Sequence, residues 1–88
     1  MWSRTQALAV GSRVREARSR SGMTQLQLVE QVERQGSTLT PATLSRLERG
    51  EASSQVYSNH ELLHAIARTT NVDESWMVYG STTIAVLT

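Results

Sequence analysis

Apolar side chains recur at spacings of three and four residues along most of this chain, and polar, glycine or proline residues separate the stretches. Such spacing places the apolar positions on one face of a helix. The pattern predicts helices over residues 6–21, 25–34, 40–50, 58–68 and 74–79. The expected fold is therefore an all-α domain of five helices.

The third of these helices carries its own start and stop signals. Thr40 suits the N-cap, where its hydroxyl accepts from a free backbone N–H, and Pro41 suits the first helical position. Gly50 readily adopts the left-handed conformation that closes a helix. Leu44 and Leu47 share one face and are expected to point toward the core. The remaining side chains of this helix then face outward.

These outward positions carry small hydroxyl groups and arginines, with no acidic side chain on the leading edge of the helix. The residues concerned are Thr43, Ser45, Arg46 and Arg49. Hydroxyl and guanidinium groups are well suited to reading base edges in the major groove of DNA. The pattern therefore favours a DNA-recognition helix.

Capping residues also delimit the neighbouring helices. Thr24 precedes the second helix, whose expected inward face consists of Leu28, Val29 and Val32, while Leu26 fits that face poorly. The first helix is expected to bury the apolar stripe Leu8, Val10, Val14 and Ala17, with Ala7 as a further candidate.

The C-terminal helices have signals of the same kind. Ser58 and Glu61 have the spacing of a capping box, so the fourth helix is predicted to begin at Ser58 after a polar loop. Asp73 is expected to cap a last short helix, in which Trp76 and Met77 fold back onto the core.

The last eight residues, 81–88, differ in character from the rest of the chain. Thr, Ile, Val and Leu predominate there, which is typical of a β-strand. We therefore divide the chain into a domain over residues 1–80 and a tail over residues 81–88. The tail is predicted to be a strand that pairs with a second copy, and the alternative is a frayed terminus or the start of a linker.

Composition narrows the class of protein. The 88 residues suffice for one small domain, and the absence of cysteine excludes disulfides and thiolate metal sites. No apolar run approaches the roughly 18 residues that a membrane span needs. The first residues lack the apolar stretch of a signal peptide, so a cytoplasmic location is expected.

The net charge is only +1, but the basic residues are unevenly distributed. All nine are arginine, and four of them (Arg13, Arg15, Arg18 and Arg20) fall close together in the first predicted helix. Arginine suits contacts to DNA phosphates. The alternative is a solvated helix face.

Two short helices, the first opening with Thr-Gln and the second ending Arg-Leu-Glu-Arg-Gly, suggest a helix-turn-helix. Here the chain resembles the Cro/repressor-type (XRE) helix-turn-helix family, which includes the lambda-type phage repressors. The resemblance covers nearly the whole domain and is carried by residues 12–18 (SRVREAR), 22–25 (GMTQ), 43–50 (TLSRLERG), 61–67 (ELLHAIA) and 72–77 (VDESWM).

The resemblance implies a role for each matching residue. Arg18 would pair with Glu48 and tie the first helix to the end of the recognition helix, and Gln25 would hold a phosphate. Arg46 is the best candidate for a bidentate contact to guanine, with a phosphate contact or a surface ion pair as the alternative. The implied DNA-binding residues are Thr24, Gln25, Thr40, Ala42, Thr43, Ser45, Arg46 and Arg49.

One segment departs from the family pattern. The family joins these two helices by a turn of a few residues, whereas residues 33–38 make the connection between Val32 and Leu39 about five residues longer. Either the second helix extends by a turn or the loop bulges. The angle of the recognition helix is affected in both cases.

His60-Glu61-Leu62-Leu63-His64 matches the zinc-protease pattern H-E-x-x-H. These are the only two histidines, no cysteine is available as a third ligand, and the leucines fit a core face. We therefore expect neither a metal site nor a cofactor, and no other arrangement typical of an enzyme is present.

The sequence thus predicts a DNA-binding transcriptional regulator, of the phage or prophage repressor type, that binds a near-palindromic operator as a dimer. The alternative is a protein-interaction module on the same fold, of the antitoxin or anti-repressor type. The modest charge, the long connection and the poorly placed Leu26 favour that alternative.

Overall fold

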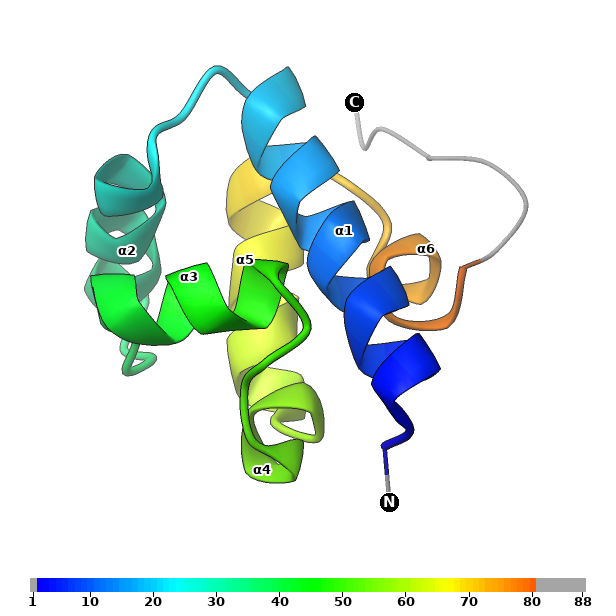
Figure 1. The fold of residues 1–88 in the computed structure, drawn as a ribbon. Helices are drawn as coiled ribbons and strands as arrows, with labels where there is room; N and C mark the ends of the chain where they lie inside the picture. The colour runs from blue at the N-terminus through cyan, green and yellow to red at the C-terminus, as the bar shows by residue number, and fades with distance from the viewer. Residues whose placement is uncertain (1, 81–88) are drawn as a thin grey trace.

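The computed structural model describes residues 2–80, which form six helices and no strand (Figure 1). The all-α class is therefore confirmed, while the expected strand in residues 81–88 lies outside the described residues. The helices are α1 (Arg4–Arg20), α2 (Gln25–Arg34), α3 (Pro41–Glu48), α4 (Ser54–Tyr57), α5 (His60–Thr70) and α6 (Glu74–Tyr79).

Helix α5 lies at the centre of the fold and contacts α1, α2, α4 and α6. Helix α3 crosses in front of α5 and packs against both α1 and α2 (Figure 1). Because α1 and α2 flank it, α3 has one inner face, toward the core, and one outer face that no other helix of residues 2–80 covers.

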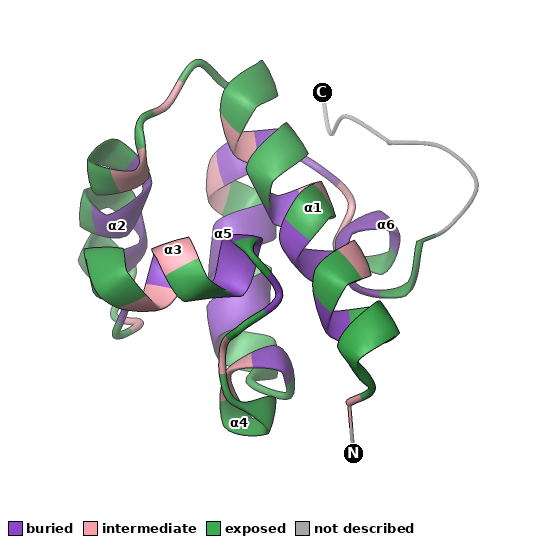
Figure 2. Cartoon of the chain, in the orientation of Figure 1, coloured by how far each residue is buried: buried purple, intermediate pink, exposed green. Residues whose placement is uncertain are grey.

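The apolar stripes of the helices meet in one core, which the purple inner faces of Figure 2 display. Burial of these side chains is the main favourable contribution to folding. The predicted inward faces of the second, third and last helices are confirmed. In the first helix, Leu8 remains 44% exposed. The largest fully buried side chains are Tyr57, Leu28, Leu39, Leu44, Leu47, Leu63, Ile66 and Met77.

Helix α1 begins two residues earlier than the apolar pattern predicts. The Ser3 hydroxyl accepts from the backbone N–H of Gln6 at 3.1 Å, and the Gln6 side chain accepts from the backbone N–H of Ser3 at 2.9 Å. This reciprocal capping box satisfies two donors that would otherwise be free. The first turn of α1 is thus defined by polar contacts and not by apolar spacing.

The predicted start of the fourth helix at Ser58 is wrong. The N-cap of α5 is Asn59, whose side chain accepts from the backbone N–H of Leu62 at 3.1 Å. The Ser58 hydroxyl instead accepts from the indole N–H of Trp2 at 2.8 Å. The preceding stretch, expected to be a polar loop, contains the single-turn helix α4, so the predicted count of five helices is also wrong.

The connection between α2 and α3 is made by a longer loop and not by a further turn of helix, because α2 ends at the predicted residue. Helix α2 continues to Arg34, and a loop of residues 35–40 then leads to Pro41. Leu39 in this loop is only 1% exposed. The connection is thus fixed to the core immediately before α3 begins.

Candidate nucleic-acid interface

The first turn of α3 is organised by Thr40. Its hydroxyl oxygen accepts from the backbone N–H of Thr43 at 3.2 Å, and Pro41 occupies the first turn as predicted. The Thr40 hydroxyl also donates to the Thr43 hydroxyl at 2.9 Å. Leu44 and Leu47 are fully buried, so the opposite face of the helix points away from the core.

That outer face brings together the side chains predicted to read DNA. Arg46 is exposed, and it forms no ion pair or side-chain hydrogen bond with any of residues 2–80. Its guanidinium group is therefore free to contact another molecule. On the same helix or its caps, Thr40, Ala42 and Arg49 are exposed, and Thr43 and Ser45 are partly exposed.

Arg49 differs from Arg46, because its side chain already has partners within the chain. Its Nε donates to the Glu51 carboxylate at 3.1 Å, and its Nη1 donates to the Ser45 hydroxyl at 2.6 Å. Both members of the ion pair are about half exposed, so the pair contributes little to stability. A phosphate could replace Glu51 at little cost.

The C-terminal end of α3 is tied to α1 by the predicted ion pair between Arg18 and Glu48. Arg18 Nε donates to Glu48 Oε2 at 2.7 Å, and Arg18 Nη2 donates to Glu48 Oε1 at 3.0 Å. The Glu48 side chain is only 4% exposed. Its hydrogen bond to the Arg18 guanidinium raises the pKa of Arg18 against the opposing effect of burial. This bidentate pair is confirmed.

The structure adds a third member to this pair. Gln25 Nε2, at the start of α2, donates to Glu48 Oε1 at 3.0 Å. The Gln25 amide predicted to hold a phosphate therefore contacts Glu48 with one N–H group, which leaves its second N–H as the donor for a phosphate. The Thr24 hydroxyl caps α2 by accepting from the backbone N–H of Gln27. The other backbone N–H groups of the first turn then remain available to a phosphate. One carboxylate thus joins α1, α2 and α3.

Gly11 is a residue of this region that sequence reasoning missed. A methyl group on Gly11 would lie 2.2 Å from the carbonyl oxygen of Leu47 and 2.8 Å from that of Glu48. Only glycine allows α1 to approach the end of α3 this closely. The signal in the sequence is a glycine inside an otherwise helical stretch.

Tyr57 was also missed. Its hydroxyl donates to the carbonyl oxygen of Leu47 at 3.1 Å and accepts from the backbone N–H of Ala52 at 3.3 Å. Burial raises the pKa of Tyr57. The residue therefore adds a second hydrogen bond to the Leu47 carbonyl, which also accepts from the backbone N–H of Gly50 at 3.1 Å, while the Tyr57 ring enters the core.

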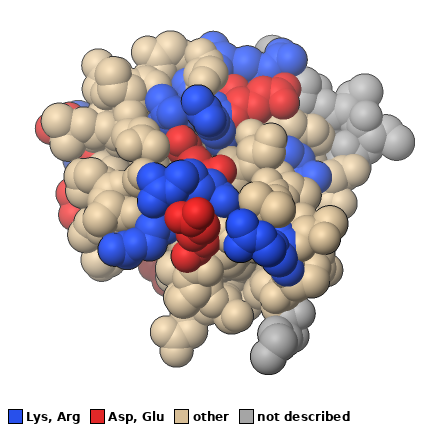
Figure 3. Space-filling model, in the orientation of Figure 1, with Lys and Arg blue, Asp and Glu red and all other residues tan. Residues whose placement is uncertain are grey.

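Arginine side chains are numerous on the face that carries α1 and α3 (Figure 3). Acidic side chains lie among them, in keeping with the small net charge of +1. Helix α3 itself contains one acidic residue, Glu48, which is buried and neutralised by Arg18. Helix α3 itself therefore presents no acidic side chain on its outer face, and Glu51, just after the helix, is half exposed and paired with Arg49.

The H-E-x-x-H stretch takes no part in a metal cluster. His64 Nδ1 lies 2.8 Å from Glu74 Oε1 at the surface. Within residues 2–80, no group of three or more metal-ligating side chains comes together. Nor does any helix in this part of the chain have the length and apolar character of a membrane span.

Comparison of the chain with protein-family models, with curated proteins and with solved structures gave no match in any of the three. What the protein binds is therefore inferred from the residues and contacts described above.

Proposed function

We propose that the protein is a sequence-specific double-stranded DNA-binding regulator, in which α2 and α3 act as a helix-turn-helix of the lambda-repressor type. In this proposal α3 enters the major groove, and the N-terminus of α2 lies against the phosphate backbone. The protein would be a cytoplasmic binding protein, not an enzyme, and it would need no cofactor.

The observation that carries the proposal is the contrast between the two faces of α3. Its inner face is buried through Leu44, Leu47 and Glu48, so the helix is rigidly placed. Its outer face presents threonine and serine hydroxyls beside the unpaired Arg46. A rigid helix with exposed donors and no exposed acid matches the chemical requirements of base readout.

Within this framework, Arg46 would contact a guanine, and Ala42 and the Thr43 methyl group would contact thymine methyls. Arg49 would exchange Glu51 for a phosphate. The protein would repress transcription from a near-palindromic operator as a homodimer, in the manner of phage or prophage repressors.

A salt titration of DNA binding tests this proposal. We expect a fluorescently labelled random duplex to bind at about 50 mM salt and to be released steeply toward about 200 mM, because arginine–phosphate contacts displace counterions. The readout is the fluorescence anisotropy of the duplex. Absence of binding at the lower salt concentration would contradict the proposal.

A protein-interaction module is the second candidate, and one observation favours it. Leu26, near the start of α2, is 58% exposed and lies on the same helix that would approach the DNA backbone. An exposed leucine suits a protein partner better than a phosphate. This candidate predicts no binding of duplex DNA at low salt, so the same titration separates the two.

A further inference from the structure

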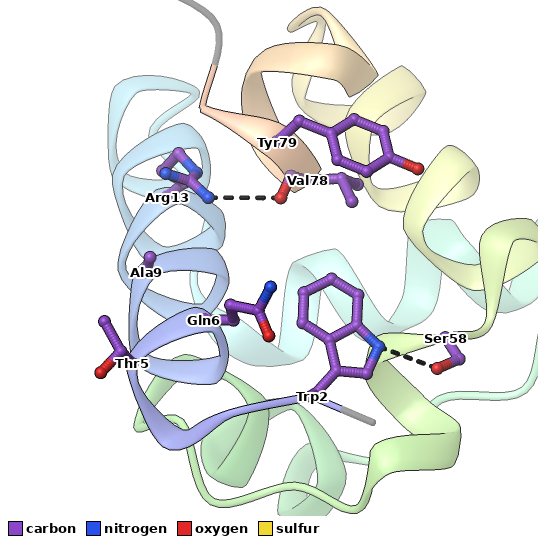
Figure 4. A pocket seen from close by; sticks show the side chains of 8 residues that line it. All are labelled: Trp2, Thr5, Gln6, Ala9, Arg13, Ser58, Val78 and Tyr79. Carbon is purple, nitrogen blue, oxygen red and sulfur yellow. Dashed lines mark hydrogen bonds between the residues drawn. The ribbon is translucent and has the colours of Figure 1, made fainter.

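A cavity of about 570 Å³ opens between the N-terminal segment with the first half of α1, Ser58 at the end of α4, and the end of α6 (Figure 4). None of the side chains that line it belongs to α2 or α3. Small-molecule sites in proteins commonly have volumes of about 300–1,000 Å³. The cavity is thus large enough for a ligand and separate from the proposed DNA surface.

One wall of the cavity is an aromatic ring that the fold holds in place. Trp2 Nε1 donates to the Ser58 hydroxyl at 2.8 Å, and the ring of Trp2 packs against that of Tyr57 with centroids 5.9 Å apart. Figure 4 shows Tyr79 across the cavity from Trp2. Because Trp2 is already fixed, stacking a flat ligand on it would require little further ordering.

A hydrogen-bond donor on α1 points toward the open space. Gln6 Oε1 accepts from the backbone N–H of Ser3 as part of the capping box. Its Nε2 forms no hydrogen bond with any of residues 2–80, and Figure 4 shows this nitrogen directed into the cavity. The amide is therefore oriented by its oxygen, while its two N–H groups remain available.

Arg13 supplies positive charge to the same cavity. Its Nε donates to the carbonyl oxygen of Met77 at 2.9 Å, and its Nη2 donates to that of Val78 at 3.3 Å. These two bonds leave three of its five N–H groups unused. Arg13 forms no ion pair within residues 2–80, and no acidic side chain lines the cavity.

We infer that this cavity binds a small planar aromatic carboxylate. The ring system lies between Trp2 and Tyr79, and the carboxylate accepts from Gln6 Nε2 and from the free N–H groups of Arg13. Charge-assisted hydrogen bonds to a guanidinium are stronger than neutral ones, so the ligand is an anion and not a neutral aromatic molecule. This inference is independent of the proposed DNA binding.

An NMR titration of the full chain with 2-naphthoate tests the inference. We expect saturable shifts of the Trp2 indole N–H and the Gln6 side-chain amide, with the buried Trp76 indole unchanged. The neutral counterpart 2-naphthalenemethanol should bind about tenfold more weakly, because it lacks the charged acceptor. Equal binding of the two probes, or no saturable shift with naphthoate, would overturn the inference.

The variant Gln6→Glu isolates the donor, because glutamate also forms a capping box with Ser3. It replaces the free N–H groups by a negative charge and should weaken naphthoate binding at least about tenfold. The matched control is Gln27→Glu, the same exchange in the capping box of α2, which should bind naphthoate like the unmodified protein.

Two further experiments test the inference if Gln6→Glu is unstable or if a second copy of the chain covers the cavity. Tyr79→Ser alters a side chain that is 73% exposed, so it should fold normally and still weaken naphthoate binding. Unchanged binding by this folded variant would overturn the inference. Concentration-dependent shifts at Trp2 without any ligand would do so as well, since they would show that a second copy covers the cavity.

Discussion

The two ends of α3 are held in different ways. At the C-terminal end, Glu48 is buried against Arg18 and Gln25, and Leu47 accepts from the Tyr57 hydroxyl. At the N-terminal end, the Thr40 hydroxyl bonds only to Thr43 among residues 2–80. Buried polar side chains therefore tie the C-terminal end to α1 and α2, whereas the N-terminal end, which follows the buried Leu39, leaves its polar groups available to a partner.

Removing the carboxylate of Glu48 should break this arrangement most severely. In Glu48→Ala, the Arg18 guanidinium stays largely buried without its partner, and we expect the free energy of unfolding to fall by about 3 kcal/mol. Urea denaturation followed by circular dichroism measures the change. The control is Glu51→Ala, which removes an exposed ion pair of Arg49 and should cost less than about 1 kcal/mol. Equal losses in the two variants would contradict the account.

Adding a methyl group where α1 meets α3 should have the next largest effect on the free energy of unfolding. A methyl group at Gly11 collides with the backbone at Leu47, so Gly11→Ala should lower the stability by about 2 kcal/mol despite the better helix propensity of alanine. Ser12→Ala, at the exposed neighbouring position, is the matched control and should leave the stability unchanged or slightly higher. A stable Gly11→Ala protein would show that the two helices do not meet so closely.

Loss of the cap at the free end of α3 should have a smaller effect on folding. Thr40→Ala removes the acceptor for the Thr43 N–H and should cost about 1 kcal/mol in thermal unfolding experiments. Ser3→Ala removes a similar cap from α1, far from the outer face of α3. If the outer face binds DNA, only Thr40→Ala should also weaken duplex binding. An equal change in DNA affinity in both variants would count against that role for Thr40.

The contacts that are local in sequence could be predicted, and those that are distant could not. Thr40, Pro41 and Gly50 delimit α3 as expected, because caps depend on residues three or four positions apart. The ion pair between Arg18 and Glu48 could be predicted only from the resemblance to a family, since nothing in the spacing of the two residues requires it.

Ser58 illustrates why a local signal can mislead. Ser58 and Asn59 are both good N-cap residues, and only the tertiary structure decides between them. The indole of Trp2, 56 residues away, uses the Ser58 hydroxyl, and Asn59 caps α5 instead. Gly11 is similar. A glycine inside a helical stretch indicates a close approach by another segment, but the sequence does not show that this segment is the end of α3.

The most direct test of the central claim compares the unmodified protein with Arg46→Ala in a selection of bound duplexes from a random pool, followed by sequencing. Arg46 is exposed and without an ion-pair partner in residues 2–80, so its removal should leave the stability almost unchanged. We predict that the unmodified protein enriches a motif with two half-sites about one helical turn apart, and that Arg46→Ala loses about 1–3 kcal/mol of discrimination at one guanine in each half-site. An identical motif for both proteins, or no enrichment at all, would contradict the assignment of α3 as the recognition helix.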